Sequence, residues 1–161
     1  MSASSAGSTS STAVTTLIKT ATVRPATAAD ADVVFGLLRE LRASYVPDRV
    51  AFDETFAAAV DPASDDIVLV STDDDDRVTG YAFTTVARLF YTNGPSAQLQ
   101  ELLVEENSRG QRIGTALVTA TEDACRASGV RQLTVVSQRA AGYYEGLGYL
   151  STADYLKRTF D

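Results

Sequence analysis

Hydrophobic and polar residues repeat along this chain with two different periods, and each period predicts a type of element. A short strand over 21–24 is followed by a helix-capping signal, in which Thr27 precedes Asp30 by three residues. The helix that follows has one apolar face, formed by Val33, Val34, Leu37, Leu38 and Leu41. A second short helix is predicted by three apolar residues at helical spacing, Phe52, Phe56 and Val60.

The middle of the chain alternates in the manner of strands. Strands are predicted over 67–71 and 78–87, joined by a turn through the acidic run 73–76, whose carboxylates we expect to be solvated. A loop with Asn93, Gly94 and Pro95 leads to a strand over 97–104. Alternation puts four residues of this strand on one face, namely Ala97, Leu99, Glu101 and Leu103. Glu101 therefore interrupts an apolar row.

The last third of the chain alternates between helix and strand. We predict a helix over 113–127 that ends at Gly129, a strand over 132–136, a short helix within 137–149 and a last strand over 152–160. Antiparallel strands followed by strand, helix, strand, helix and strand indicate an α/β (α+β) fold. The expected architecture is a mixed, mostly antiparallel sheet of about six to seven strands, flanked by about four helices on both faces.

A basic turn that contains glycine opens the helix at residue 113. A helix start leaves amide N–H groups unpaired and carries partial positive charge, so a turn around it can bind phosphate. Gly110 and Gly114 allow close backbone approach, while Arg109 and Arg112 add cations. The spacing fits neither a P-loop, whose lysine is missing, nor a dinucleotide fingerprint. We therefore predict that this turn binds an anion.

A second motif, SQRAAGYYEGLGY, covers residues 137–149 and carries two tyrosines. Together, RGQRIGTAL and RAAGYYEGLGY resemble the pyrophosphate turn and the distal tyrosine helix of the GCN5-related N-acetyltransferase (GNAT) family. The resemblance runs from Arg24 to the C-terminus, with its motif detail between residues 99 and 149. Two positions depart from the family pattern. Arg112 stands where the consensus has its first glycine, and Ser137 stands where many members have an asparagine.

The resemblance implies a GNAT-like fold with acetyl-CoA as the acyl donor. Backbone groups of Leu102, Leu103 and Val104 would pair with the pantetheine arm, as an added strand does. The turn would hold the diphosphate through Arg109, Gly110, Gln111, Arg112, Ile113, Gly114 and Thr115, and Ser137 would contact the arm. The side chain of Arg112 could also reach the 3′-phosphate of coenzyme A.

Attack of an amine on a thioester needs a proton acceptor and a proton donor. The chain has no histidine. Glu101 is the first choice as base, because it interrupts an apolar face where several family members carry a carboxylate; a structural polar residue is the alternative reading. Glu105 and Glu106 are weaker candidates, since residues past a strand end are usually solvated. Tyr144 matches the family's acid, and Tyr143 is expected to be core because it occupies the family's Phe position.

Composition limits the remaining possibilities. A chain of 161 residues, 45% hydrophobic and 22% charged, fits one acetyltransferase domain over 21–161, preceded by a disordered Ser/Thr/Ala-rich tail over 1–20. No apolar run is long enough for a membrane span and no secretory signal is visible, so we expect a cytoplasmic protein without a membrane partner. A net charge of −7 argues against nucleic acid and suits a cationic substrate.

These observations predict an N-acetyltransferase that transfers an acetyl group from acetyl-CoA to a primary amine of a small molecule by direct attack. Two alternatives stay open. One is a CoA-binding regulatory protein without turnover, and the other is a peptide or protein N-acetyltransferase. We expect no metal site, and a homodimer is left open.

Overall fold

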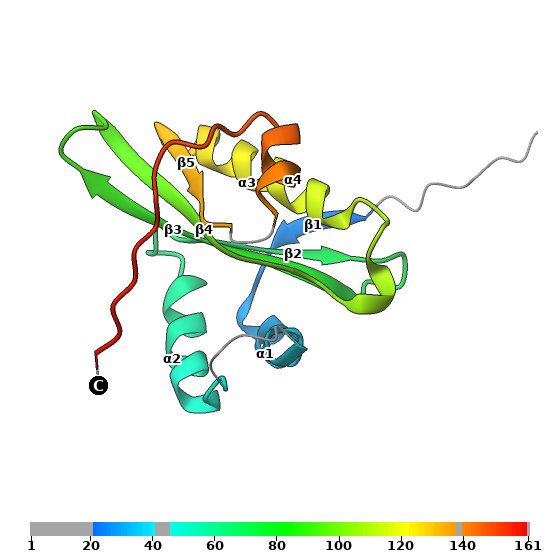
Figure 1. Cartoon of the computed structure of the whole chain (residues 1–161). Helices are drawn as coiled ribbons and strands as arrows, with labels where there is room; N and C mark the ends of the chain where they lie inside the picture. Colours follow the sequence, from blue (N-terminus) through cyan, green and yellow to red (C-terminus); the bar gives the residue numbers. More distant parts are fainter. Residues whose placement is uncertain (1–20, 41–45, 138–139, 161) are drawn as a thin grey trace, which may run out of the picture.

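The computed structural model describes residues 21–40, 46–137 and 140–160. The predicted tail over 1–20 and Leu41 lie outside these residues. Five strands form one sheet in the order β1-β2-β3-β4-β5 (Figure 1). The strands are β1 Thr22–Pro25, β2 Ile67–Thr72, β3 Val78–Leu89, β4 Gly94–Val104 and β5 Gln132–Val135. The first three pairings are antiparallel, and β4 pairs with β5 in parallel.

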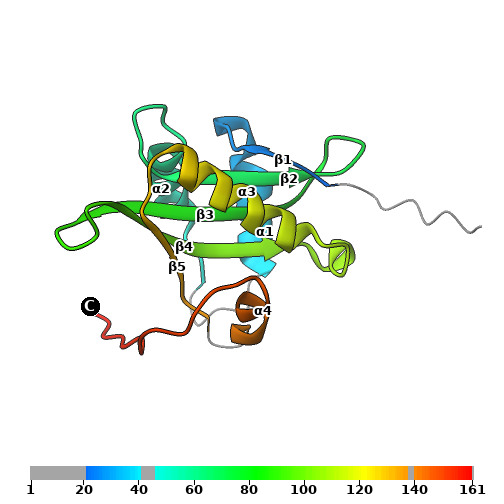
Figure 2. The same ribbon diagram turned by 90° about the horizontal axis from the view of Figure 1, so that it is seen from above.

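Helices cover both faces of the sheet. They are α1 Ala31–Glu40, α2 Arg49–Ala59, α3 Ile113–Ala127 and α4 Ala141–Gly146, with short 3₁₀ turns η1 Ala28–Asp30 and η2 Glu106–Ser108. Helices α1 and α2 lie on one face, and α3 runs across the other (Figures 1 and 2). This arrangement confirms the predicted fold class. No helix in the described ranges is long and apolar enough to cross a membrane.

Two hydrophobic cores fix the helices to the sheet. On one face, Val34 and Leu37 of α1 and Phe56 of α2 pack on strand residues that include Tyr81 and Leu103. On the other face, α3 packs through Ile113, Leu117 and Val118 on Leu69, Ala82 and Leu99. The capping signal at Thr27 is confirmed, since its backbone N–H donates to Asp30 Oδ2 at 2.7 Å.

A β-bulge in β4 changes which residues share a face. Leu99 pairs with Thr84 but Glu101 pairs with Phe83, so Gln100 is an extra residue on β4. One extra residue moves every later side chain to the opposite face. Leu99 therefore packs with α3, whereas Leu103 packs with α1 and α2. The prediction that Ala97, Leu99, Glu101 and Leu103 share one face is wrong for this reason.

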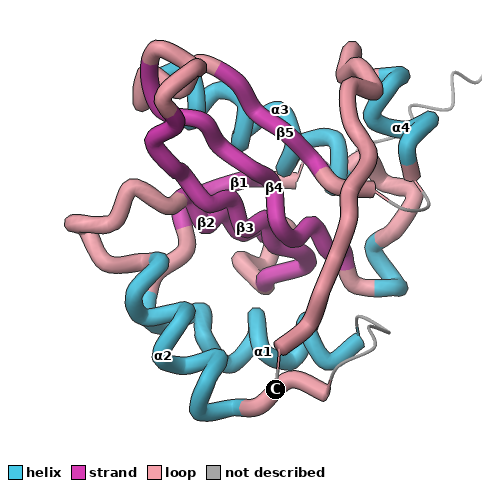
Figure 3. Tube along the Cα trace, turned by 60° about the vertical axis from the view of Figure 1, so that its left-hand side comes forward, coloured by secondary structure: helices cyan, strands magenta, loops and turns pink. Residues whose placement is uncertain are grey.

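The predicted last strand over 152–160 does not form, so the sheet has five strands rather than six or seven. The chain instead runs from α4 past the side of the sheet as a loop (Figure 3). Every side chain over 151–160 is exposed. Without an apolar face to bury, this segment lacks the packing that stabilises an added strand.

The acidic run 73–76 forms the predicted turn between β2 and β3, but not all of its carboxylates are solvated. Asp73 is only 12% exposed at its side chain and lies 3.3 Å from Arg77 Nε. Its Oδ1 also accepts hydrogen bonds from the backbone N–H groups of Asp75 and Arg77. Asp73 therefore stabilises the turn by accepting hydrogen bonds from its backbone, as aspartate does in Asx-turns.

Candidate functional site

Strand β5 ends opposite Leu99, beside the bulge in β4. All four of its residues pair with β4, from Gln132 with Ser96 to Val135 with Leu99. From Gln100 onward, β4 has no strand partner on this side among the described residues, although it continues to Val104. An unpaired strand edge offers N–H and C=O groups to any extended ligand that lies along it. The predicted pantetheine-binding residues, Leu102, Leu103 and Val104, all lie on this edge.

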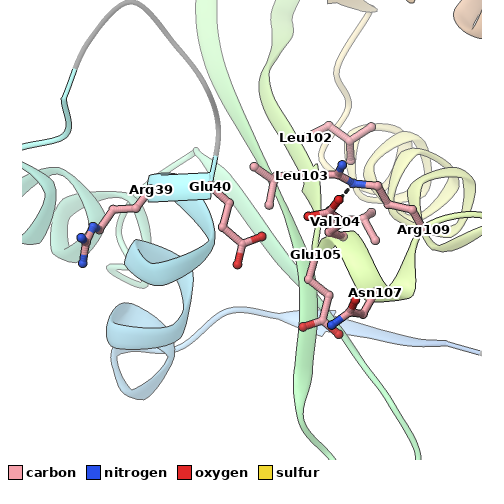
Figure 4. A pocket seen from close by; sticks show the side chains of 9 residues that line it. Arg39, Glu40, Leu102, Leu103, Val104, Glu105, Asn107 and Arg109 are labelled. Carbon is pink, nitrogen blue, oxygen red and sulfur yellow. Dashed lines mark hydrogen bonds between the residues drawn. The ribbon is translucent and has the colours of Figure 1, made fainter.

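A cavity of about 850 Å³ lies between the end of α1 and the end of β4. Its lining consists of Arg39, Glu40, Leu102, Leu103, Val104, Glu105, Glu106, Asn107 and Arg109. Figure 4 shows Glu40 pointing from α1 toward β4, while Arg39 points away. Arg109 lies beside Val104, and its Nε donates to the Val104 carbonyl at 3.0 Å. The cavity thus brings four predicted donor-site residues together.

The predicted anion-binding turn leads directly into α3. Gly110 has φ +77° and Arg112 has φ 62° and ψ 16°, so both adopt the left-handed conformation. The first backbone bond of α3 runs from the Ala116 N–H to the Arg112 carbonyl at 3.0 Å. In the described part of the chain, the backbone N–H groups of residues 110–115 have no hydrogen-bond acceptor. Several donors are therefore available at a helix start, where anions bind.

Glu101 lies on the α1 and α2 face, one residue after the bulge. The Tyr81 hydroxyl donates to Glu101 Oε2 at 2.8 Å. Tyr81 is 1% exposed, and burial, with the nearby Glu101 charge, raises the pKa of Tyr81 well above its ordinary value. Tyr81 therefore stays protonated and orients the carboxylate. From the sequence, Tyr81 could line the acceptor site or merely pack, and its contact with Glu101, 20 residues away in the chain, was not predicted.

Tyr144 of α4 lies on the α3 side of the sheet. Its side chain packs with α3 and Leu99 and is 8% exposed. It lines a cavity of about 450 Å³ together with Gln98, Thr134 and Ser137. The Tyr144 hydroxyl makes no hydrogen bond with any described residue. Burial raises the pKa of Tyr144, and the nearby Tyr143 raises it further. Tyr144 and Glu101 thus lie on opposite faces of the sheet.

Comparison with known proteins identifies the family. A sequence profile described as "Acetyltransferase (GNAT) family" matches residues 36–149. The chain belongs to the GNAT family. As a member, it is an acyl-CoA-dependent N-acetyltransferase, and the predicted family resemblance is confirmed. No curated protein sequence matches this chain.

Solved structures share this fold. Glucosamine-6-phosphate N-acetyltransferase from Arabidopsis thaliana is 19% identical, with a TM-score of 0.75, 89% of this chain covered and 100% of that one. A transcriptional regulator from Bacillus halodurans C-125 is 21% identical, with a TM-score of 0.74 and coverages of 88% and 100%. An aminoglycoside acetyltransferase from an uncultured soil metagenomic sample, in complex with sisomicin, is 18% identical, with a TM-score of 0.67 and coverages of 88% and 97%.

Two residues depart from the GNAT consensus, and the structure gives each a local role. Arg112 adopts a left-handed backbone conformation that glycine reaches freely. For arginine, this conformation costs about 1–2 kcal/mol of backbone strain. The Ser137 hydroxyl oxygen accepts a hydrogen bond from the Ala140 N–H at 2.9 Å, close to the start of α4. Its own O–H is still able to donate to a ligand.

Tyr143 is not a core residue, contrary to the prediction from the GNAT Phe position. It is 39% exposed, and its hydroxyl lies 3.1 Å from Thr115 Oγ1. Its ring meets that of Tyr144 edge-on at 5.1 Å between centroids. A phenylalanine could not make the polar contact. The hydroxyl therefore holds Tyr143 against the first turn of α3 and connects α4 to the predicted anion-binding turn.

Glu105 supports the turn and is not free to act as a base. Its carboxylate accepts two hydrogen bonds of 2.7 Å from the Arg77 guanidinium and one from Ser108 Oγ. The side chain of Glu105 is 17% exposed. Arg77 lowers the pKa of Glu105, burial opposes that shift, and the Ser108 hydroxyl lowers it further. The expectation that Glu105 is solvated is wrong, because its partner Arg77 lies 28 residues earlier in the chain, directly before β3.

We predict that Glu105→Gln weakens binding of acetyl-CoA several-fold and lowers the melting temperature at neutral pH. A carboxyl whose folded pKa is depressed stabilises the fold above its unfolded pKa, near 4.5, and loses that effect as pH falls through the folded pKa. The stability difference from the wild type should therefore shrink on acidification below about pH 4.5. Calorimetric titration and melting curves measure both effects.

Glu106→Gln is the matched control, since Glu106 is exposed and next in sequence. It removes the same charge from the same turn without breaking the Arg77 contact. Equal affinities and melting temperatures for the two variants would contradict a supporting role for Glu105.

Proposed function

We propose that this GNAT protein transfers an acetyl group from acetyl-CoA to a primary amine of a small molecule. The observation that carries the proposal is the unpaired edge of β4 directly after Leu99, next to a turn whose N–H groups have no acceptor among the described residues. A strand edge and an anion-binding helix start, joined by one continuous segment, match an extended donor that ends in a diphosphate.

In this proposal the residues of the turn bind the donor and fix its register. The N–H groups of residues 110–115 would hold the diphosphate, with Arg109 and Arg112 adding charge. The edge groups of Leu102, Leu103 and Val104 would pair with the arm, and Ser137 would donate to it. An N–H of β4 near the thioester carbonyl would stabilise developing charge there. One such donor is worth ~10²- to ~10³-fold in rate.

Glu101 and Tyr144 would carry the protons. Glu101 would accept one proton from the substrate ammonium, which frees the nitrogen lone pair to attack the acetyl carbonyl. The N–C bond forms and the C–S bond breaks, and Tyr144 would donate a proton to the leaving sulfur. The nitrogen loses its second proton, which restores Tyr144 by way of solvent. The net products are an amide, a thiol and one released proton.

A base is needed because an alkyl amine with pKa about 10.4 is protonated at neutral pH. Removing that proton near pH 7 requires ~4 kcal/mol, taken as ~3 pKa units at ~1.36 kcal/mol each. A carboxylate that is oriented by Tyr81 and lies on a largely apolar face supports this role for Glu101. The net charge of −7 also favours a cationic acceptor over an anionic one.

Acetyl-CoA at about 100 times its Kd is expected to stabilise the protein by about 2.7 kcal/mol and to raise the melting temperature by roughly 5–10 °C. NAD and ATP also carry phosphates but lack the pantetheine arm, so at the same concentration they should raise the melting temperature far less. An unchanged melting curve with acetyl-CoA would refute the donor site. Release of free thiol on addition of small amines then tests turnover.

A further inference from the structure

A small apolar cavity of about 60 Å³ lies between the sheet and helices α1 and α2. Its walls include Phe52, Phe56, Tyr81 and Phe83, and Glu101 contributes the only charged side chain in its lining, all of which is described. Thr55, at its edge, already donates its hydroxyl to the Ala51 carbonyl at 2.9 Å. Apart from Glu101, the cavity therefore offers a polar ligand almost no free hydrogen-bonding group.

Glu101 presents a carboxylate at one end of this apolar space. Tyr81 holds Oε2, while Oε1 accepts no hydrogen bond from any described residue. A carboxylate beside apolar walls is best compensated by a cation that hydrogen-bonds to it. The aromatic walls add to this preference, because ring faces attract ammonium groups as well as alkyl groups.

Glu101 also marks the position where a bound amine would meet the donor. Leu99 is the last residue of β4 that pairs with β5, and Glu101 follows the bulge at Gln100. An ammonium on Glu101 would therefore lie where the unpaired edge of β4 begins. This step rests on the proposed function, which uses that edge for the acyl donor.

We propose that the acceptor is a small primary amine with a short alkyl substituent, whose ammonium binds Glu101 and whose alkyl group fills the cavity walled by Phe52 and Phe56. The volume of about 60 Å³ leaves room for a few carbon atoms, since a water molecule takes up roughly 30 Å³ in the liquid. Hydroxyl-rich amines, such as amino sugars, would lose hydrogen bonds to water that the apolar walls cannot replace. Burial of methylene groups favours the alkyl amine.

The test is a series of ethylamine, propylamine, butylamine, hexylamine and octylamine, with glucosamine 6-phosphate and sisomicin as polar competitors, assayed by thiol release. We expect kcat/KM to rise from ethylamine to propylamine or butylamine, to fall again for octylamine, and to exceed that of both polar amines by at least about ten-fold. Higher kcat/KM for either polar amine, or no dependence on chain length, would overturn the inference while leaving the acetyltransferase proposal intact. Thiol release with none of the amines would overturn the inference, and the melting curve with acetyl-CoA would then decide the proposed donor site separately.

A variant pair tests the cavity itself. Phe52→Ala enlarges it and should shift the preferred alkyl chain to hexylamine or octylamine. Phe35→Ala is the matched control, because the Phe35 ring contacts Phe52 at 5.1 Å between centroids but does not line the cavity. The control should lower stability without changing the order of substrates. An unchanged order in a folded Phe52→Ala variant would overturn the inference, and if that variant does not fold the wild-type series decides alone.

Discussion

Replacing Tyr144 by phenylalanine is expected to lower kcat about 100-fold, with little change in the affinity for acetyl-CoA. The substitution keeps the ring that packs with α3 and Leu99 and removes only the hydroxyl. That hydroxyl bonds to none of the described residues, so its loss leaves no buried partner unsatisfied. A fall in kcat without a fall in melting temperature would be the signature of a proton donor. Steady-state thiol release and melting curves measure the two quantities.

Tyr149→Phe is the matched control for this prediction. The Tyr149 ring lies 5.6 Å from that of Tyr144, and its hydroxyl donates to Glu122 Oε1 at 3.1 Å. Removing this hydroxyl breaks a structural hydrogen bond worth about 1 kcal/mol, so we expect lower stability with kcat nearly kept. Similar kcat losses in the two variants would show that Tyr144 acts through packing. Full activity of Tyr144→Phe would remove it from the mechanism.

Tyr144 should also keep its proton in alkaline solution. Burial raises its pKa, so the phenol stays a donor over the range in which more of the amine substrate is neutral. An ordinary tyrosine ionises at about pH 10. We therefore expect that kcat does not fall near pH 10 through ionisation of Tyr144.

The sequence predicted most of the fold because its signals were local. Helix α3 was predicted over 113–127 and forms over Ile113–Ala127, where an apolar stripe and Gly129 mark the face and the end. The last strand failed because strand formation needs a partner edge and a buried face. The residues over 152–160 specify neither.

The site was predictable where backbone chemistry defines it and not where distant contacts do. The left-handed turn before α3, which we propose binds the diphosphate, was predicted from glycines and cations at a helix start. No sequence motif indicates the bulge at Gln100, yet the bulge determines on which face of the sheet Glu101 lies. Arg77, the partner of Glu105, lies directly before β3, and Tyr81, the partner of Glu101, lies in β3, so strand register sets both contacts. Register depends on the whole sheet and therefore escaped sequence reasoning.

Replacing Glu101 by glutamine is expected to lower kcat/KM about 10²- to 10³-fold at neutral pH, provided that the residue accepts the amine proton. Glutamine keeps the size of the side chain and can still accept the Tyr81 hydrogen bond, so stability should change little. The variant would depend on amine that is already neutral in solution. That fraction rises about ten-fold per pH unit up to the amine pKa of about 10.4.

The ratio of wild-type to Glu101→Gln activity should therefore narrow steadily as the pH rises from 7 to 10. Tyr81→Phe separates orientation from proton transfer, because it leaves the carboxylate but removes the 2.8 Å hydrogen bond that positions it. We expect a smaller loss, with a ratio to wild type that does not change with pH. A constant ratio for Glu101→Gln as well would mean that Glu101 binds or positions the amine without taking its proton. Such a result would leave deprotonation to water or to the environment of the bound substrate.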